Sequence, residues 1–184
     1  MRDRITTMDI PFICARLRAA KTRGELAITV MGVVSRYSLY DLLHMRGAIE
    51  KQLRHLPPSY RQRLFPKLME QIFGTHHLLI CMFYEGKFHH MPESLDPAFV
   101  EYCDLVERVC TGPSGYLHPR FDLLYFLLAG FAIFVLHLPG HPVGTPFPGG
   151  LTVTHAGGEY LCPIRDKEDE VENAICRFCP ARQG

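Results

Sequence analysis

The stretch Leu123–Leu136, LLYFLLAGFAIFVL, decides the fold class. It is uncharged and almost entirely apolar, and it lies between Asp122 and His137. A helix that spans a membrane needs about 20 apolar residues, so this segment is too short to do so. A helix that is apolar on all sides is typically buried inside a protein. The sequence therefore predicts a central helix that begins at Pro119 and is surrounded by other helices.

The residues before this stretch supply those helices. Leucine, isoleucine and methionine recur at helical spacing through much of residues 10–110. Ser38 with Asp41 three positions later is typical of a capped helix start, and Asp96-Pro97 is a second start signal. Pro57-Pro58 marks a stop between two helices. We expect residues 1–138 to form a mainly α, multi-helix bundle.

The composition changes abruptly after Leu138. Residues 139–150, PGHPVGTPFPGG, contain four prolines and four glycines, which exclude helix and regular strand. We call residues 139–150 the strap. Residues 151–184 then predict a small tail module: a hairpin from 151–154 and 159–161 around Gly157-Gly158, followed by a cysteine knuckle.

Bulk composition limits the class of protein. The 184 residues are 47% hydrophobic and 21% charged, which is ordinary for a packed globular chain. Net charge is +1, but residues 1–70 hold 13 Lys and Arg against 6 Asp and Glu. The N-terminus has no apolar segment typical of a secretory signal. An odd count of seven scattered cysteines favours reduced thiols. We expect a cytoplasmic protein without a membrane span.

The strongest chemical signal is Cys162 followed by Cys176-x-x-Cys179. Two thiolates in a C-x-x-C pair can converge on one metal, and tetrahedral zinc needs four such ligands. His141 is the first choice for the fourth ligand because the strap leads directly into the tail. Further candidates for that position are His155, Cys81, Cys103 and Cys110. An iron–sulfur cluster, a redox dithiol and simple packing of small apolar side chains remain as alternatives.

Basic residues gather around the Pro57-Pro58 turn. Together with Tyr60, they could bind phosphates and stack bases. The residues proposed for this nucleic-acid interface are Arg54, Arg61, Arg63 and Lys67. Glutamates 50 and 70 dilute the charge, so a solvated face is the favoured interpretation and nucleic acid an unlikely partner.

No phosphate-binding glycine loop, nucleophile elbow or H-E-x-x-H motif is present, so catalytic residues stay unassigned and whether the chain is an enzyme stays open. The leading hypothesis is a binding or accessory module with a structural zinc site. Its partner would be an unknown protein or a second copy of the chain. The alternatives are an iron–sulfur or other metal-centred redox protein or enzyme with its site beside the strap, and a nucleic-acid binder.

The last third of the chain resembles a known family. Three motifs carry the resemblance: His141-Pro-x-Gly-Thr-Pro-Phe-Pro-Gly-Gly150, Gly157-Gly-x-Tyr-x-Cys-Pro163 and Cys176-x-Phe-Cys-Pro-Ala181. They are similar to the C-terminal signature of domain-of-unknown-function family 2115, an uncharacterised group from methanogenic archaea. The resemblance implies an anaerobic, cytoplasmic setting in which iron–sulfur clusters are common. It implies no known reaction and no established ligand set.

Overall fold

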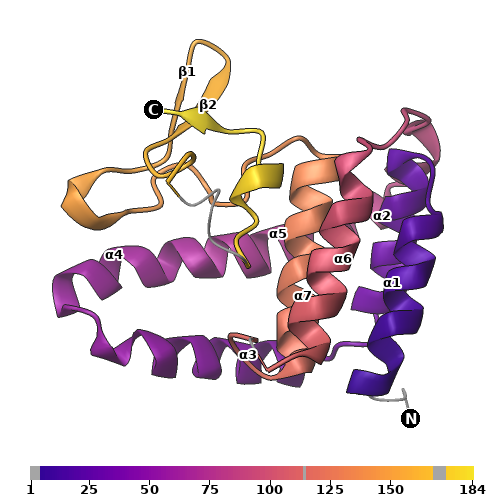
Figure 1. The fold of residues 1–184 in the computed structure, drawn as a ribbon, viewed down its shortest axis with the longest axis horizontal. Coiled ribbons are helices and arrows are strands. Elements are labelled where there is room, and N and C mark those ends of the chain that lie inside the picture. Colours follow the sequence, from indigo (N-terminus) through magenta and orange to yellow (C-terminus); the bar gives the residue numbers. More distant parts are fainter. Residues whose placement is uncertain (1–4, 114, 168–172) are drawn as a thin grey trace.

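A computed structural model describes residues 5–113, 115–167 and 173–184 (Figure 1). It is mainly helical with one small sheet near the C-terminus, which confirms the expected fold class. The helices are α1 (Ile10–Ala19), α2 (Arg23–Val34), α3 (Leu39–Gln52), α4 (Pro58–Met69), α5 (Thr75–Tyr84), α6 (Ala98–Thr111) and α7 (Pro119–Gly130). Two π-helical turns are η3 (Glu70–Gly74) and η5 (Phe131–Val135), and the strands are β1 (Thr154–Ala156), β2 (Glu159–Cys162) and β3 (Arg182–Gln183).

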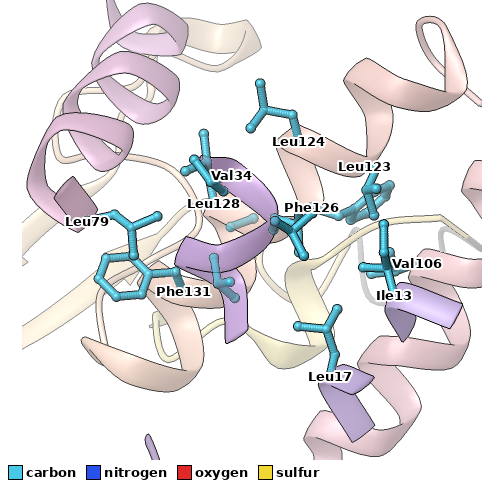
Figure 2. Close-up of a cluster of buried hydrophobic side chains, with 14 of the residues drawn as sticks. Ile13, Leu17, Val34, Leu79, Val106, Leu123, Leu124, Phe126, Leu128 and Phe131 are labelled. Carbon is cyan, nitrogen blue, oxygen red and sulfur yellow. The ribbon is translucent and has the colours of Figure 1, made fainter. Parts of the chain in front are cut away.

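The apolar stretch forms the centre of the body, as predicted. α7 begins with Pro119 at its first turn and continues without a break into η5. Phe126 and Phe131 are completely buried in it. Figure 2 shows side chains of α7 and η5 among those of Ile13, Val34 and Leu79, which come from α1, α2 and α5. One helix thus receives apolar contacts from several others, which explains why its sequence has no polar face.

α6 lies between α1 and α7, and the three helices run side by side in Figure 1. Apolar residues of α6, among them Phe99 and Val106, are buried in this layer. At its edge, Arg18 of α1 forms ion pairs of 2.7 Å with Asp104 and 2.6 Å with Glu107. These partly exposed pairs orient α1 on α6 and add little stability of their own.

α3 and α4 form an arm that extends to the left in Figure 1, at a steep angle to α1, α6 and α7. The predicted start of α3 is confirmed: Ser38 and Asp41 make a capping box, in which the Asp41 carboxylate accepts from the Ser38 N–H at 2.8 Å. The same carboxylate pairs with Arg120 of α7 at 2.6 Å, and both side chains are only 8% exposed. This buried ion pair attaches the arm to the central helix.

The central helix ends at an arginine contact. The Arg23 guanidinium donates hydrogen bonds to the carbonyl oxygen of Val135, one of them at 2.7 Å, which satisfies an acceptor that the helix end leaves open. His137 follows in a left-handed conformation (φ 54°) and turns the chain into the strap. Among the described residues, no single helix has the length and apolar character to cross a membrane. α2 and Leu39–His55 would reach that length only as a pair bent by 90°.

The tail forms a three-stranded sheet in the order β1-β2-β3. The hairpin predicted around Gly157-Gly158 is present, but its first strand is Thr154–Ala156 rather than 151–154, because residues 151–153 pair with the strap instead. Phe147 N–H, for example, donates to the Leu151 carbonyl at 2.8 Å. β3, which runs parallel to β2, was not predicted, since a two-residue strand has no readable periodicity.

Two apolar contacts fix the tail on the body. Ile175 belongs to the main core, and the Phe178 ring packs on Tyr102 and Phe134 with centroid separations of 5.2 and 6.1 Å. The strap and the tail share a second, small core, formed by Phe147, Val153, Cys162 and Ala181. That core is too small to hold an isolated tail together, so the attachment to the body matters for its stability.

Candidate metal centre

The four residues proposed as zinc ligands line the wall of one small cavity. His141, Cys162, Cys176 and Cys179 all line a small cavity of about 10 Å³ between the strap and the tail. We call it the thiolate cavity. Its volume is about that of a single water-sized sphere. The other lining residues are Pro139, Gly140, Val153, Arg165, Ile175 and Ala181.

Cys162 ends β2 and begins a tight turn. Burial raises the pKa of its thiol, and hydrogen bonds from the backbone N–H groups of Ile164 and Arg165 oppose that rise. Ionisation of Cys179 would raise this pKa further, whereas the charge of Arg165 lowers it. Cys162 is 6% exposed. Backbone N–H groups directed at sulfur are the outer contacts that orient a thiolate ligand in a metal site.

Cys176 and Cys179 lie on a single 3₁₀ turn, η7 (Cys176–Phe178), and its C-cap. The turn is closed by the Cys179 N–H, which donates to the Cys176 carbonyl at 3.0 Å. The Cys179 sulfur accepts a hydrogen bond of 3.3 Å from the backbone N–H of Gly140 in the strap. The strap therefore contacts the knuckle through its backbone.

His141 occupies the side of the cavity that faces the strap. Burial lowers the pKa of its imidazole to about 4, so the ring is neutral at physiological pH. A neutral imidazole is the form that binds a metal. The ring stands perpendicular to Phe147 at a centroid distance of 5.8 Å, and this contact limits its orientation.

The four side chains surround the cavity without converging on one point. Within residues 5–113, 115–167 and 173–184, no three His, Cys, Asp or Glu side chains are grouped closely enough to hold a metal ion as they stand. All seven cysteines belong to these ranges, and none forms a disulfide. Binding of one ion would require the side chains to move inward across the cavity.

The other candidates for a fourth ligand lie elsewhere. His155 is on β1, where its ring packs at a tilt against that of Tyr160, with 4.6 Å between the centroids. Cys81 on α5 contacts His77, with 3.5 Å between Sγ and Nε2. Cys103 and Cys110 are fully buried in α6, where burial raises the pKa of both thiols, that of Cys103 to about 12. Such inert thiols act as small apolar side chains.

The basic residues of the proposed nucleic-acid interface are spread along the arm. Lys67 of α4 is paired with Glu70 at 2.7 Å and lies against Gly144 of the strap. The Tyr60 hydroxyl donates to the carbonyl of Pro146 at 3.0 Å, so its role is to hold the strap on α4. Arg54 and Arg63 are exposed, and Arg61 lies between them in the sequence and reaches the Arg54 carbonyl at 3.4 Å. A solvated face stays the favoured interpretation of these residues, and nucleic-acid binding stays the alternative.

Sequence reasoning missed two parts of this site. Arg165 brings a positive charge to the wall of the thiolate cavity, and Gly140 supplies an N–H to Cys179. The only available signal was position: Arg165 follows Cys162 by three residues, and Gly140 precedes His141. Neither residue type is diagnostic, so spacing alone could not have assigned them.

Comparison with known proteins extends the resemblance beyond the C-terminal signature. A family model described as "Uncharacterized protein conserved in archaea (DUF2115)" matches residues 22–184. The chain belongs to the DUF2115 family. The match includes α2 to α7 as well as the strap and tail, so the helical body is part of what the family shares.

Relatives in this family come from methanogens and are named UPF0305 proteins. One from Methanocaldococcus jannaschii is 27% identical over 150 residues, which is 79% of this chain and 87% of the relative. One from Methanothermobacter thermautotrophicus is 26% identical over 165 residues, which is 89% of this chain and 97% of the relative. One from Methanopyrus kandleri is 29% identical over 127 residues, which is 69% of this chain and 86% of the relative. No solved structure matches the chain significantly.

Proposed function

We propose that this DUF2115 protein is a cytosolic binding or accessory module whose tail is held on the helical body by one structural zinc ion. The ligands are His141, Cys162, Cys176 and Cys179. The main support is that these four side chains, which come from the strap, the end of β2 and η7, line one cavity. An ion bound by donors so far apart in the sequence would hold together the strap, the end of β2 and η7, which have few apolar contacts with one another.

The chemistry of the donors suits zinc. Three thiolates and one imidazole are a common tetrahedral set, with Zn–S distances near 2.3 Å. Three thiolates with Zn²⁺ leave a net charge of −1. Arg165, which lines the cavity and already lowers the pKa of Cys162, is placed to compensate that charge.

The surroundings favour a structural role over a catalytic one. Cys162 and Cys176 are buried, and the volume of the thiolate cavity matches one ion without an added substrate. A structural ion would also explain how a tail with so small a core remains folded.

The test is metal content of the full chain purified without oxygen, measured by elemental analysis together with an absorption spectrum. We expect about one zinc per chain. The double variant Cys176→Ser/Cys179→Ser should lose it. Cys81→Ser is the matched control, because Cys81 lies on α5 outside the thiolate cavity, and it should keep the metal.

Replacement of zinc by Co²⁺ gives a second readout. Tetrahedral thiolate coordination should produce intense visible bands and a sulfur-to-cobalt charge-transfer band, which weaken when His141 is changed to Ala. Iron with labile sulfide would support the cluster alternative instead. Absence of stoichiometric metal, or zinc that persists in the double variant, contradicts the proposal.

A further inference from the structure

Six of the seven cysteines have a place in the helical core or in the thiolate cavity. Three are completely buried in α1 and α6, and three line the thiolate cavity. The first group is Cys14, Cys103 and Cys110, and the second is Cys162, Cys176 and Cys179. Cys81 on α5 belongs to neither group: it is half-buried and forms no disulfide. All seven lie in the described part of the chain, so Cys81 is the one thiol left for chemistry outside the proposed metal site.

A histidine side chain lies against the Cys81 sulfur. Sγ is 3.5 Å from Nε2 of His77 and 4.0 Å from Nδ1 of the same ring. The two residues are four positions apart on α5, so they share one face of the helix, and the regular backbone keeps them together. At this distance the thiol can donate its proton to Nε2. A histidine beside a cysteine is the arrangement that produces the thiolate, which is the nucleophilic form of the side chain.

The pair is open to a reagent from outside. His77 is exposed, and the residues three positions before and after Cys81, Leu78 and Tyr84, are 38% and 80% exposed. Glu85 follows one turn after Cys81, and its carboxylate pairs with Lys87 at 2.6 Å. The lysine compensates part of a negative charge that would otherwise oppose a thiolate on this face of α5. A small molecule can therefore approach the sulfur without unfolding the helix.

The other thiols of the chain are poorly suited to form an internal disulfide with Cys81. Burial raises the pKa of each of the three core thiols, to about 12 for Cys14 and Cys103, so they stay protonated and unreactive. The remaining three line the thiolate cavity, and Cys81 is not among the residues of its wall. A disulfide at Cys81 therefore takes its second sulfur from another molecule.

We propose that Cys81 and His77 form a site of reversible thiol modification, at which Cys81 forms a mixed disulfide with a low-molecular-weight disulfide reagent. His77 accepts the Cys81 proton, and the thiolate attacks one sulfur of the reagent. A new S–S bond joins that sulfur to Cys81, the S–S bond of the reagent breaks, and the departing thiolate takes up the proton held by His77. One disulfide is exchanged for another, so no further oxidant is needed. The reaction does not depend on the proposed zinc site.

The test follows the reaction of the folded, full-length protein with dipyridyl disulfide, which releases a coloured thione for each thiol that reacts. We expect a fast phase that corresponds to about one thiol per chain, because the core thiols are inert. Mass spectrometry of peptides should locate the adduct at Cys81, and Cys81→Ser should remove the fast phase. A fast phase that is absent from the wild type, that persists in Cys81→Ser, or that modifies Cys162, Cys176 or Cys179 in its place would overturn the proposal.

His77→Gln tests the imidazole. The side chain is exposed, so the variant should unfold at the same temperature as the wild type, whereas loss of the proton acceptor should slow the fast phase by about tenfold or more. His89→Gln is the matched control, because His89 is also exposed but lies on η4 (Lys87–His90) rather than on α5. This control should react at the rate of the wild type. Equal rates for His77→Gln and the wild type, or equal slowing in the two histidine variants, would overturn the proposal.

Discussion

The backbone N–H of Gly140 donates a hydrogen bond of 3.3 Å to the Cys179 sulfur, across 39 residues of sequence. The contact joins the first turn of the strap to the cysteine knuckle near the end of the chain. It also places the strap backbone in the outer shell of the proposed zinc site, so the strap serves as more than a connector.

Removing that N–H should weaken metal binding. Gly140→Pro abolishes the donor, and loss of one outer-shell contact typically lowers metal affinity by about 10-fold or more. The matched control is Gly140→Ala, which keeps the N–H but directs a Cβ at the Ile175 side chain, 2.7 Å away. Competition with a chromophoric chelator measures both affinities. Equal affinities for the two variants would show that the hydrogen bond is unimportant.

Extraction of the metal should loosen the tail while leaving the helical body folded. After treatment with a chelator, we expect limited proteolysis to begin within residues 139–184, while far-ultraviolet circular dichroism changes little, because the main core is built from residues of the body. Proteolysis that starts equally in α1 or α6, or no change at all, would argue against a zinc ion that holds the tail.

The buried pair of Asp41 and Arg120 should make stability depend on pH. Burial by itself would raise the pKa of Asp41, but hydrogen bonds from Arg120 and Ser38 outweigh it and lower the pKa to about 2. In the unfolded chain the carboxyl titrates near 3.8. The unfolded state therefore binds more protons between these values, and the contribution of the pair is lost as pH falls from about 4 to about 2.

Asp41→Asn should remove that part of the pH dependence and lower the free energy of unfolding at pH 7 by about 3 kcal/mol, since Arg120 is left buried without its partner. Asp104→Asn is the control, because Asp104 also pairs with an arginine but its side chain is 63% exposed. Asp104→Asn should lower the free energy of unfolding by less than about 1 kcal/mol. Urea unfolding at several pH values measures both, and similar losses for the two variants would contradict the argument.

Phe178 should act as the apolar anchor of the tail. Its ring packs on Tyr102 and Phe134, but the side chain is only partly buried, so Phe178→Ala should lower stability by about 2 kcal/mol rather than the larger cost of a fully buried phenylalanine. Leu151→Ala, at a 51% exposed position of the tail, should be nearly neutral in the same thermal unfolding measurement.

Two glycine substitutions should have opposite effects on the stability of the protein. A Cβ at Gly130 would approach the Tyr102 ring to 2.9 Å, and Tyr102 is held in place by its 2.6 Å hydrogen bond to the Phe126 carbonyl. Gly130→Ala should therefore destabilise by about 1 kcal/mol. Gly32→Ala adds a methyl group to open space within α2 and should stabilise by about 0.5 kcal/mol. Chemical denaturation would distinguish the two variants. An increase in stability for both would contradict the close contact between a Cβ at position 130 and the Tyr102 ring.

Local signals in the sequence predicted most of the body. The apolar stretch 123–136, the capping pair Ser38–Asp41 and the start at Asp96-Pro97 each act over a few residues, so they could be recognised without the fold. The π-helical turns could not, because they arise where helices adapt to their neighbours. Nor could the partner of Asp41, since Arg120 lies 79 positions away and carries no mark of burial.

The candidate site was predicted in part. Cysteine spacing suggested which thiols to group, and the strap position of His141 suggested the fourth donor. That these side chains line one cavity depends on how the strap folds back on residues 151–153, which short-range patterns do not encode.

Pro139 and Gly140 form part of the walls of the thiolate cavity and also of a larger cavity, of about 370 Å³, that is lined by Leu128 and Ala132. If drawing the thiolates and His141 onto an ion shifts these two residues, it reshapes the larger cavity as well. Binding at the two cavities is then coupled, and thermodynamic coupling is reciprocal. The ion changes the affinity for a molecule in the larger cavity by some factor, and that molecule changes the affinity for the ion by the same factor. Pro139 and Gly140 would in that case couple binding at the two cavities.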